Sequence, residues 1–192
     1  MADLLYLDLE TLGDKHQARG PFATKLFHFR DAAKVRMESH GHEPGCAMPM
    51  RGAYMVDSRL LWTRAENDLF LAYQDTNATT KDAAVAITAV ALEALTGTFY
   101  EREGNARGEG FDFTLWQGTR DETDSLSPED RLLLRYSRRV AYLEVTGVSS
   151  QTQNAVRRMR DKVMKFRTRT FKLPLWIIVV DFQEPSFLME VS

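Results

Sequence analysis

The chain has 192 residues, 44% of them hydrophobic, and a formal net charge of −2. This length suits one compact domain with an appended N-terminal part, and the apolar fraction is ordinary for a globular core. The nearly balanced charge argues against a protein that coats nucleic acid over its whole surface.

The cysteine content and the lengths of the apolar runs indicate the cellular compartment in which the protein is expected. The single cysteine, Cys46, excludes an intramolecular disulfide framework and fits a reducing environment. Residues 1–8 lack the cationic and apolar regions of a signal peptide, and no apolar run reaches the roughly 20 residues of a membrane span. We therefore expect a cytoplasmic protein without a membrane partner.

Residues 3–12 mix acidic and apolar side chains and predict a strand. Within them, residues 5–11 resemble the first motif of DEDD-type exonucleases, in which an Asp-x-Glu pair holds two metals. That resemblance implies a 3′→5′ exonuclease that uses Asp8 and Glu10. The late helix of this chain offers only Asp161 and completes neither the histidine nor the tyrosine motif of that family. The other interpretation is an edge strand with solvated acids.

A helix is expected from Ala23 to Ser39, after the break at Gly20-Pro21. The segment His40-Gly41-His42-Glu43-Pro44-Gly45-Cys46 follows it. His-x-His with a nearby cysteine is typical of half a zinc site, but no second ligand pair has matching spacing, and the glycines and proline favour a loop. Residues 50–75 predict short helices or strands without deciding between them.

A second helix is expected from Lys81 to Leu95, opened by a capping box at residues 79–82 and ended by Gly97. Because it is apolar on nearly every side, it belongs in the core between a sheet and another layer. Glu93 is the one acid in its second half, and it either reaches solvent or supports an acidic site.

Two strand-like runs each contain one isolated carboxylate. Residues 108–116 contain Asp112, and residues 138–147 contain Glu144 near the end that Gly147 is expected to terminate. Between them, residues 117–130 are acidic and loop-like, and Ser127-Pro128 predicts a short helix. Two acids on neighbouring strands can hold a divalent metal against a phosphodiester.

A strongly basic helix is expected next, from Ser149 or Ser150 to about Phe166. Eight Lys or Arg residues and one acid lie between residues 157 and 172. Its apolar face is predicted as Val156, Met159, Val163 and Phe166, and one flank carries Gln151, Arg158, Lys162, Lys165 and Arg169. A near-continuous apolar strand over residues 175–182 and a short strand over residues 187–191 complete the sheet.

With one further strand in the 117–140 region, this order is similar to the αβββαβ order of PD-(D/E)xK nuclease-like domains. Residues 110–112 resemble the first acidic motif of that family, and residues 143–147 resemble the second. The resemblance covers residues 80–192, and residues 1–79 have no counterpart. It implies an α/β fold with a restriction-endonuclease-like mixed β-sheet core flanked by helices. Residues 1–79 are expected to form an N-terminal, mostly helical extension packed on that core.

The chain departs from the family at one position. The second motif of the family ends in lysine, and Thr146 stands there. In some members that lysine has moved to the following helix, where Lys162 is the best candidate and Lys165 or Arg158 are substitutes. If none of them reaches the carboxylates, the domain binds without cutting.

The resemblance therefore implies a metal-dependent endonuclease acting on DNA, or on RNA, in restriction or phage defence, alone, as a homodimer or with a partner subunit. The alternatives are a catalytically inactive module that binds nucleic acid or a protein, and a core acid beside a solvated helix. The expected site consists of catalytic Asp112, Glu144 and Lys162; ligands for Mg²⁺ or Mn²⁺ from Asp112, Glu144, the Val145 carbonyl and Glu93; and phosphate contacts from Arg157, Arg158, Lys165 and Arg169.

Overall fold

The structure is a computed structural model that describes residues 4–12, 21–101, 111–117, 127, 139–150 and 154–192. Within these ranges the fold is mixed α/β, with two sheets and four α-helices. No helix among the described residues combines the length and the apolar character needed to cross a membrane.

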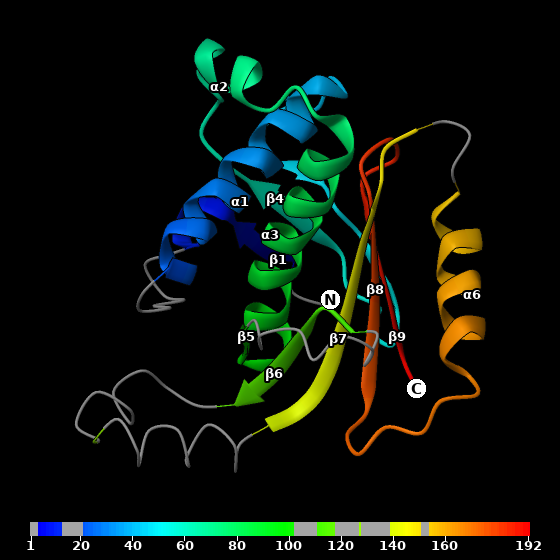
Figure 1. Ribbon diagram of the computed structural model, residues 1–192. Coiled ribbons are helices and arrows are strands. Elements are labelled where there is room, and N and C mark those ends of the chain that lie inside the picture. Colours follow the sequence, from blue (N-terminus) through cyan, green and yellow to red (C-terminus); the bar gives the residue numbers. More distant parts are fainter. Residues whose placement is uncertain (1–3, 13–20, 102–110, 118–126, 128–138, 151–153) are drawn as a thin grey trace.

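The larger sheet has six strands in the order β3-β9-β8-β7-β6-β5 (Figure 1). The strands β5 (Thr98–Glu101), β6 (Phe113–Gln117) and β7 (Arg139–Val148) pair antiparallel in sequence. The strand β8 (Leu175–Asp181) lies parallel to β7, and β9 (Ser186–Val191) returns antiparallel to β8. A short strand from the N-terminal part, β3 (Met50–Gly52), lies parallel to β9 and forms one edge.

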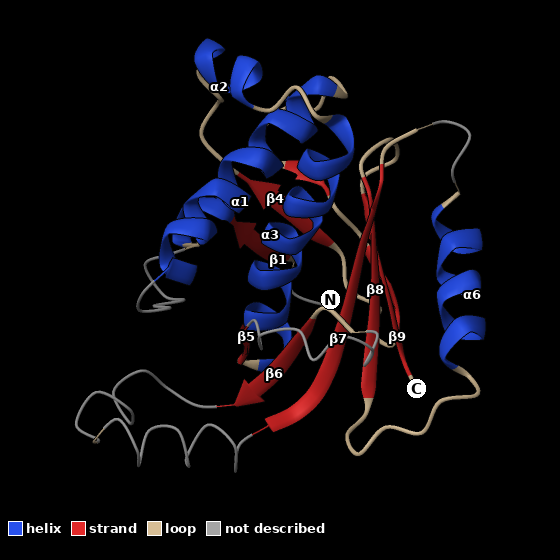
Figure 2. Cartoon of the chain, viewed as in Figure 1, coloured by secondary structure: helices blue, strands red, loops and turns tan. Residues whose placement is uncertain are grey.

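Helices cover both faces of this sheet (Figure 2). The helix α3 (Thr76–Thr96) packs on one face in a large apolar cluster that includes Leu143, Val145, Ile178 and Val180. The crossover helix α6 (Ala155–Phe166) packs on the other face, in a second cluster with Val148, Leu175, Ile177 and Val179. Alternating residues of β7 and β8 thus point into opposite layers. The strand β8 is apolar on both faces, as expected for a central strand, whereas β7 has the buried polar residues Glu144 and Thr146 on the α6 face.

The N-terminal part contributes strands as well as helices. The helix α1 (Pro21–Ser39) packs against α3, and α2 (Asn67–Ala72) follows it beyond three more strands. A three-stranded sheet combines β1 (Leu5–Asp8), β4 (Ser58–Leu61) and β2 (Cys46–Ala47), with β1 parallel and β2 antiparallel to β4. The expectation of a mostly helical extension missed this sheet, and the extension shares the core of the chain because Leu7, Leu26 and Met50 belong to the large cluster.

Helix α3 begins five residues earlier than the sequence predicted. Its N-cap is Asp75, whose side chain accepts hydrogen bonds from the backbone N–H groups of Asn77 and Ala78. The capping box expected at Thr79 therefore lies inside the helix. The C-terminal end was predicted correctly, because Gly97 adopts the left-handed conformation at φ 64°.

Helix α6 begins later than predicted, and its apolar face is narrower. Asn154 is the N-cap and accepts a hydrogen bond from the Arg157 N–H, so neither Ser149 nor Ser150 starts the helix. Met159 and Phe166 are buried as predicted, whereas Val156 is 60% exposed. The prediction that Val156 packs on the sheet was wrong.

Gly147 lies within β7 and pairs with Val180, so it does not end the strand as predicted. A Cβ atom at this position would lie 2.5 Å from the Thr80 carbonyl oxygen on α3. The glycine is needed here for the close approach of α3 to β7, and this approach fixes the height of α3 above the sheet.

A strand that the sequence analysis did not predict, β5 at Thr98–Glu101, precedes β6 and pairs antiparallel with it. The further strand that the αβββαβ order requires in the 117–140 region falls largely on residues 118–126 and 128–138, which lie outside the described residues, as does most of the expected short helix after Ser127. The strand β6 also starts later than predicted, so Asp112 immediately precedes it. Among the described residues from Thr76 onward, the order is α3-β5-β6-β7-α6-β8-β9.

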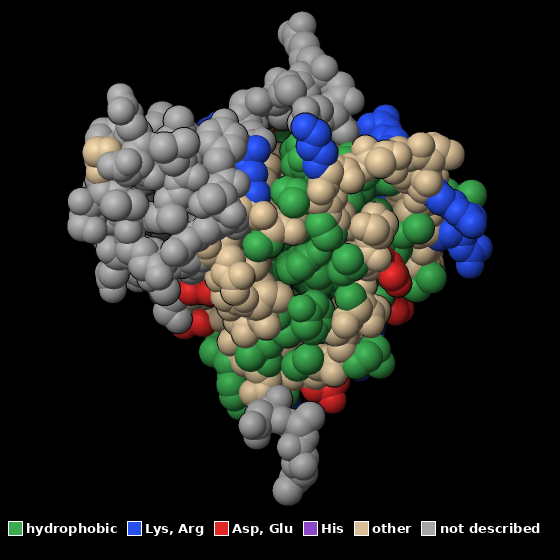
Figure 3. All heavy atoms as spheres, turned by 90° about the horizontal axis from the view of Figure 1, so that it is seen from below, with side chains coloured by type: hydrophobic (Ala, Val, Ile, Leu, Met, Phe, Trp, Pro, Cys, Tyr) green, Lys and Arg blue, Asp and Glu red, His purple; other side chains and the backbone are tan. Residues whose placement is uncertain are grey.

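The lower end of the molecule, where β7 and β8 begin, has a mainly apolar surface at its centre (Figure 3). Lys and Arg side chains are spread around the margin of this view and form no continuous patch among the coloured residues. The visible part of this end is therefore not a uniform cationic surface.

Candidate functional site

Asp112 and Glu144 meet where β6 begins beside the middle of β7. The register pairs Phe113 with Leu143, and the Asp112 N–H donates to the Leu143 carbonyl at 2.9 Å. Asp112 precedes β6 and lies against residues 143–145 of β7, and its charge acts on the Glu144 carboxyl. Two acids 32 positions apart in the sequence are thereby brought together by one strand pair.

Asp112 is held by two donors, one for each oxygen. The Val145 N–H donates to Oδ2 at 3.0 Å, and the Lys81 ammonium donates to Oδ1 at 2.9 Å. Phe113 is the first residue of β6, and Asp112 precedes it. The Asp112 carboxylate accepts the Val145 N–H hydrogen bond that a backbone carbonyl would accept if the strand pairing continued. Lys81 comes from the N-terminal third of α3, and our sequence analysis gave it no role.

Glu144 is 6% exposed. Its carboxylate accepts a hydrogen bond from the Lys162 ammonium on α6 and forms an ion pair with it. Burial, and then the negative charge of Asp112, raise the pKa of the Glu144 carboxyl above its usual value, while Lys162 and Lys165 oppose that shift. The influence of Asp112 on Glu144 shows that the two carboxylates share one electrostatic environment. Carboxyl groups with shifted pKa values are typical of functional sites, although structural ion pairs also produce them.

Lys162 occupies the position that the helical wheel assigned to it, on the flank of α6 nearest the sheet. Its side chain is 15% exposed, so the ammonium group is enclosed between α6 and β7. Thr146, two residues after Glu144, lies on the same face of β7 and is also buried. β7 has the uncharged residue Thr146 at this position, and Lys162 of α6 supplies a cation to the same face of the strand.

The four predicted phosphate contacts fall into two pairs. The Lys165 ammonium lies 4.8 Å and the Arg169 guanidinium 5.5 Å from the centre of the Phe166 ring, and Lys165 also acts on the Glu144 carboxyl. Arg157 and Arg158 are exposed in the first turn of α6. Arg158 shares the flank of Lys162, and Lys162 forms the ion pair with Glu144.

Glu93 is not brought to this site. It lies twelve positions after Lys81 on α3, about 18 Å along the helix axis at 1.5 Å per residue. No group of three His, Cys, Asp or Glu side chains that could hold a metal occurs within the described ranges. The described acids at this site are therefore Asp112 and Glu144 alone.

The remaining candidate metal ligands, which are the Asp112 and Glu144 carboxylates and the Val145 carbonyl, are compatible with Mg²⁺ or Mn²⁺. Both carboxylates supply hard oxygen ligands, and the Val145 N–H faces Asp112. Because the N–H and C=O of a strand residue point to the same side, the Val145 carbonyl faces the same edge. Two carboxylates and one carbonyl suit Mg²⁺, which usually keeps several waters and takes few protein ligands.

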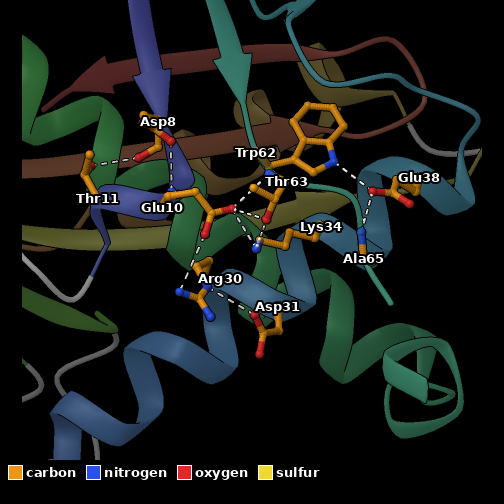
Figure 4. A network of polar contacts seen from close by, with 10 residues as sticks. All are labelled: Asp8, Glu10, Thr11, Arg30, Asp31, Lys34, Glu38, Trp62, Thr63 and Ala65. Atoms are coloured by element: carbon orange, nitrogen blue, oxygen red, sulfur yellow. Dashed lines mark hydrogen bonds and ion pairs between the residues drawn. The ribbon is translucent and has the colours of Figure 1, made fainter. Parts of the chain in front are cut away.

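The Asp8 and Glu10 pair forms part of a structural network (Figure 4). Glu10 forms an ion pair with Lys34 at 2.6 Å. It also accepts hydrogen bonds from the Thr63 N–H at 2.9 Å and the Thr63 hydroxyl at 2.8 Å. Burial alone would raise its pKa, but these donors outweigh it and lower the pKa to about 2. Asp8 caps the short 3₁₀ helix at Leu9–Thr11 by accepting from the Glu10 N–H at 3.0 Å. These contacts account for both acids without a metal.

The His40–Cys46 segment forms a turn and the start of β2, as the loop interpretation predicted in part. His42 Nε2 lies 2.8 Å from the Phe182 carbonyl, and Gly41 and Gly45 have φ values of 78° and 85°. Burial raises the pKa of the Cys46 thiol to about 11, which disfavours the thiolate that zinc requires. The contacts of this segment are those of a structural connection.

In comparisons with known proteins, no family model, no curated protein and no solved structure matched this chain.

Proposed function

We propose that this protein is a metal-dependent nuclease with a restriction-endonuclease-like core. The observation that carries the proposal is the meeting of Asp112, Glu144 and Lys162, which come from two neighbouring strands and the crossover helix. The order α3-β5-β6-β7-α6-β8, with β7 parallel to β8, supports it because the αβββαβ arrangement is that of PD-(D/E)xK nucleases.

Each side chain has a distinct role in this proposal. Asp112 and Glu144, with the Val145 carbonyl, hold Mg²⁺ or Mn²⁺, which when bound lowers the pKa of a coordinated water and offsets charge on the phosphate. The Val145 N–H orients the Asp112 carboxylate at 3.0 Å. Lys162 replaces the lysine missing at Thr146, and its enclosed ammonium stabilises negative charge that develops beside Glu144.

The substrate class follows from the charge on α6. Arg158 and Lys165 lie on the flank of Lys162, Arg157 is exposed beside Arg158, and exposed Arg169 follows the end of the helix. Cations in a row beside a carboxylate pair suit a phosphate backbone, with sequence-independent contacts that position the strand. We therefore propose DNA as the substrate, with RNA as the second polymer to assay.

The test compares cleavage and binding in the same variants. Plasmid and linear DNA, and RNA, are incubated with Mg²⁺, Mn²⁺ or EDTA, while affinity for a labelled duplex is measured separately. We expect Glu144→Gln and Asp112→Asn to lose at least about 100-fold in cleavage and to retain duplex binding. Asp161→Asn, an exposed carboxylate on α6, is the matched control and keeps full activity.

Equal degradation by the wild type and both site variants would remove the proposal. Duplex binding by every variant, with no metal-dependent cleavage by the wild type, would favour a nucleic-acid-binding module instead. The lysine partners of both carboxylates give that second function its support, because they can satisfy the two acids without catalysis.

A further inference from the structure

The two lysines at the site differ in how firmly they are held. Lys162 and Glu144 have side chains that are 15% and 8% exposed, so their ion pair is enclosed. Lys81 and Asp112 are 59% and 20% exposed, so this pair opens to solvent on the lysine side. An exposed pair contributes little to stability and opens readily, whereas leaving one partner of a buried pair alone is costly.

The two oxygens of Asp112 are also held differently. Oδ2 accepts from the Val145 backbone N–H, which the strand pairing fixes, and Oδ1 accepts from Lys81. A cation that binds Asp112 therefore competes with Lys81 for Oδ1 and leaves the Val145 contact in place. Lys81 lies on α3 and Lys162 on α6, and these two helices lie on opposite faces of the sheet (Figure 1).

We propose that Lys81 is a displaceable positioning residue that exchanges the Asp112 carboxylate for a substrate phosphate and so couples metal binding to substrate binding. The inference rests on the proposed nuclease function. Without a substrate, Lys81 competes with the divalent cation at Oδ1. When a phosphodiester enters, the ammonium transfers from the carboxylate to a phosphate oxygen, and Oδ1 is released to the metal.

Exchange of this kind makes the coupling reciprocal. A phosphate that draws Lys81 away raises the affinity of the site for metal, and bound metal raises the affinity for the phosphate by the same factor. Lys162 takes no part in the exchange because its ion pair with Glu144 is more enclosed than the pair of Lys81 with Asp112. The inference therefore assigns the two lysines different roles.

The test measures Mn²⁺ affinity by calorimetric titration, with and without a duplex whose phosphorothioate linkages resist cleavage. Lys81→Met is expected to bind Mn²⁺ about two- to five-fold more tightly than the wild type without the duplex, as expected for the loss of a half-exposed ion pair. In the wild type the duplex tightens Mn²⁺ binding, and in Lys81→Met this effect is reduced. Lys81→Arg keeps the coupling, and Lys25→Met, an exposed lysine on α1, behaves as the wild type.

The outcomes separate this inference from the proposed function. If the wild type binds Mn²⁺ and cleaves DNA while Lys81→Met shows unchanged Mn²⁺ affinity and an unchanged duplex effect, Lys81 has only a structural role and this inference fails alone. If the wild type neither binds Mn²⁺ nor cleaves DNA, the proposed function fails and this inference fails with it.

Discussion

The Glu10 carboxylate is a stabilising group whose effect depends on pH. Its folded-state pKa of about 2 lies below the ordinary value of 4.5, so the folded protein prefers the ionised form. The stabilisation is therefore complete above about pH 4.5 and is lost as the pH falls towards 2. Chemical denaturation of Glu10→Gln should show a free energy of unfolding about 2 kcal/mol lower at pH 7, with a smaller difference at pH 3.

The matched control for Glu10 is Glu43, which is exposed and pairs with exposed Arg64. Glu43→Gln should change the free energy of unfolding by less than about 1 kcal/mol at either pH. An equal loss for the two variants at pH 7 would contradict the structural role given to the Glu10 network.

Lys162 combines a structural and a catalytic role, which two variants can separate. Lys162→Met leaves buried Glu144 without its main partner, so we expect a loss of about 2–4 kcal/mol in stability and of at least about 100-fold in cleavage. The double variant Glu144→Gln/Lys162→Met should recover part of the stability but none of the activity. Thermal denaturation and a cleavage assay measure the two effects. Full cleavage by soluble, folded Lys162→Met would exclude the catalytic role.

Helix α3 owes its position over β7 to the lack of a side chain at Gly147. In Gly147→Ala the new Cβ would lie 2.5 Å from backbone oxygen, so α3 has to shift, at a cost of about 2–4 kcal/mol. Gly97→Ala is the comparison, because its Cβ meets nothing within 4 Å and the cost is about 1 kcal/mol from the left-handed backbone. Urea denaturation should rank Gly147→Ala well below Gly97→Ala, and the reverse order would show that the contact with Thr80 relaxes freely.

At the scale of elements, the sequence predicted what local patterns encode. The α3 helix and the β8 strand have long apolar runs, and α6 has apolar residues at helical spacing; these elements and β9 lie where they were predicted to within several residues. The start of α3 was missed because Asp75, which is not part of a capping box, supplies the cap. The role of Gly147 was missed because the close approach of Thr80 is a tertiary contact, and a glycine after an apolar strand also fits a turn.

The same distinction applies to the site. The resemblance implied a lysine on the helix after β7, and helical periodicity selected Lys162 because it lies nearest the apolar face of α6; its ion pair with Glu144 agrees with that choice. The role of Lys81 could not be assigned from the sequence. Its partner Asp112 lies 31 positions later in the chain, and their contact depends on how α3 crosses the sheet. Glu93 was proposed as a ligand from its isolation on an apolar helix, a pattern that does not tell which end of the helix approaches the acids.

The whole molecule folds around one large core to which both halves of the sequence contribute. Residues 80–192 alone would lack α1, which covers α3, and β3, which covers the edge of β9. They would also begin inside α3, without its cap at Asp75. We expect a fragment starting at Thr76 to expose apolar surface and to show weak amide-exchange protection, whereas the whole chain is protected in β7 and β8. A cooperatively unfolding, protected fragment would show that residues 1–75 are dispensable.

The pairing of β3 with β9 joins Met50 to Phe187, which lie 137 positions apart. During synthesis at about 5–20 residues per second, the early segments therefore wait for several seconds or more before β9 has left the ribosome. Throughout that interval Met50 and the apolar faces of α1 and α3 are available to chaperones or to wrong partners. We therefore expect substitutions in β3 to reduce the yield of active molecules mainly by acting on the nascent chain during synthesis, and less by destabilising the folded protein.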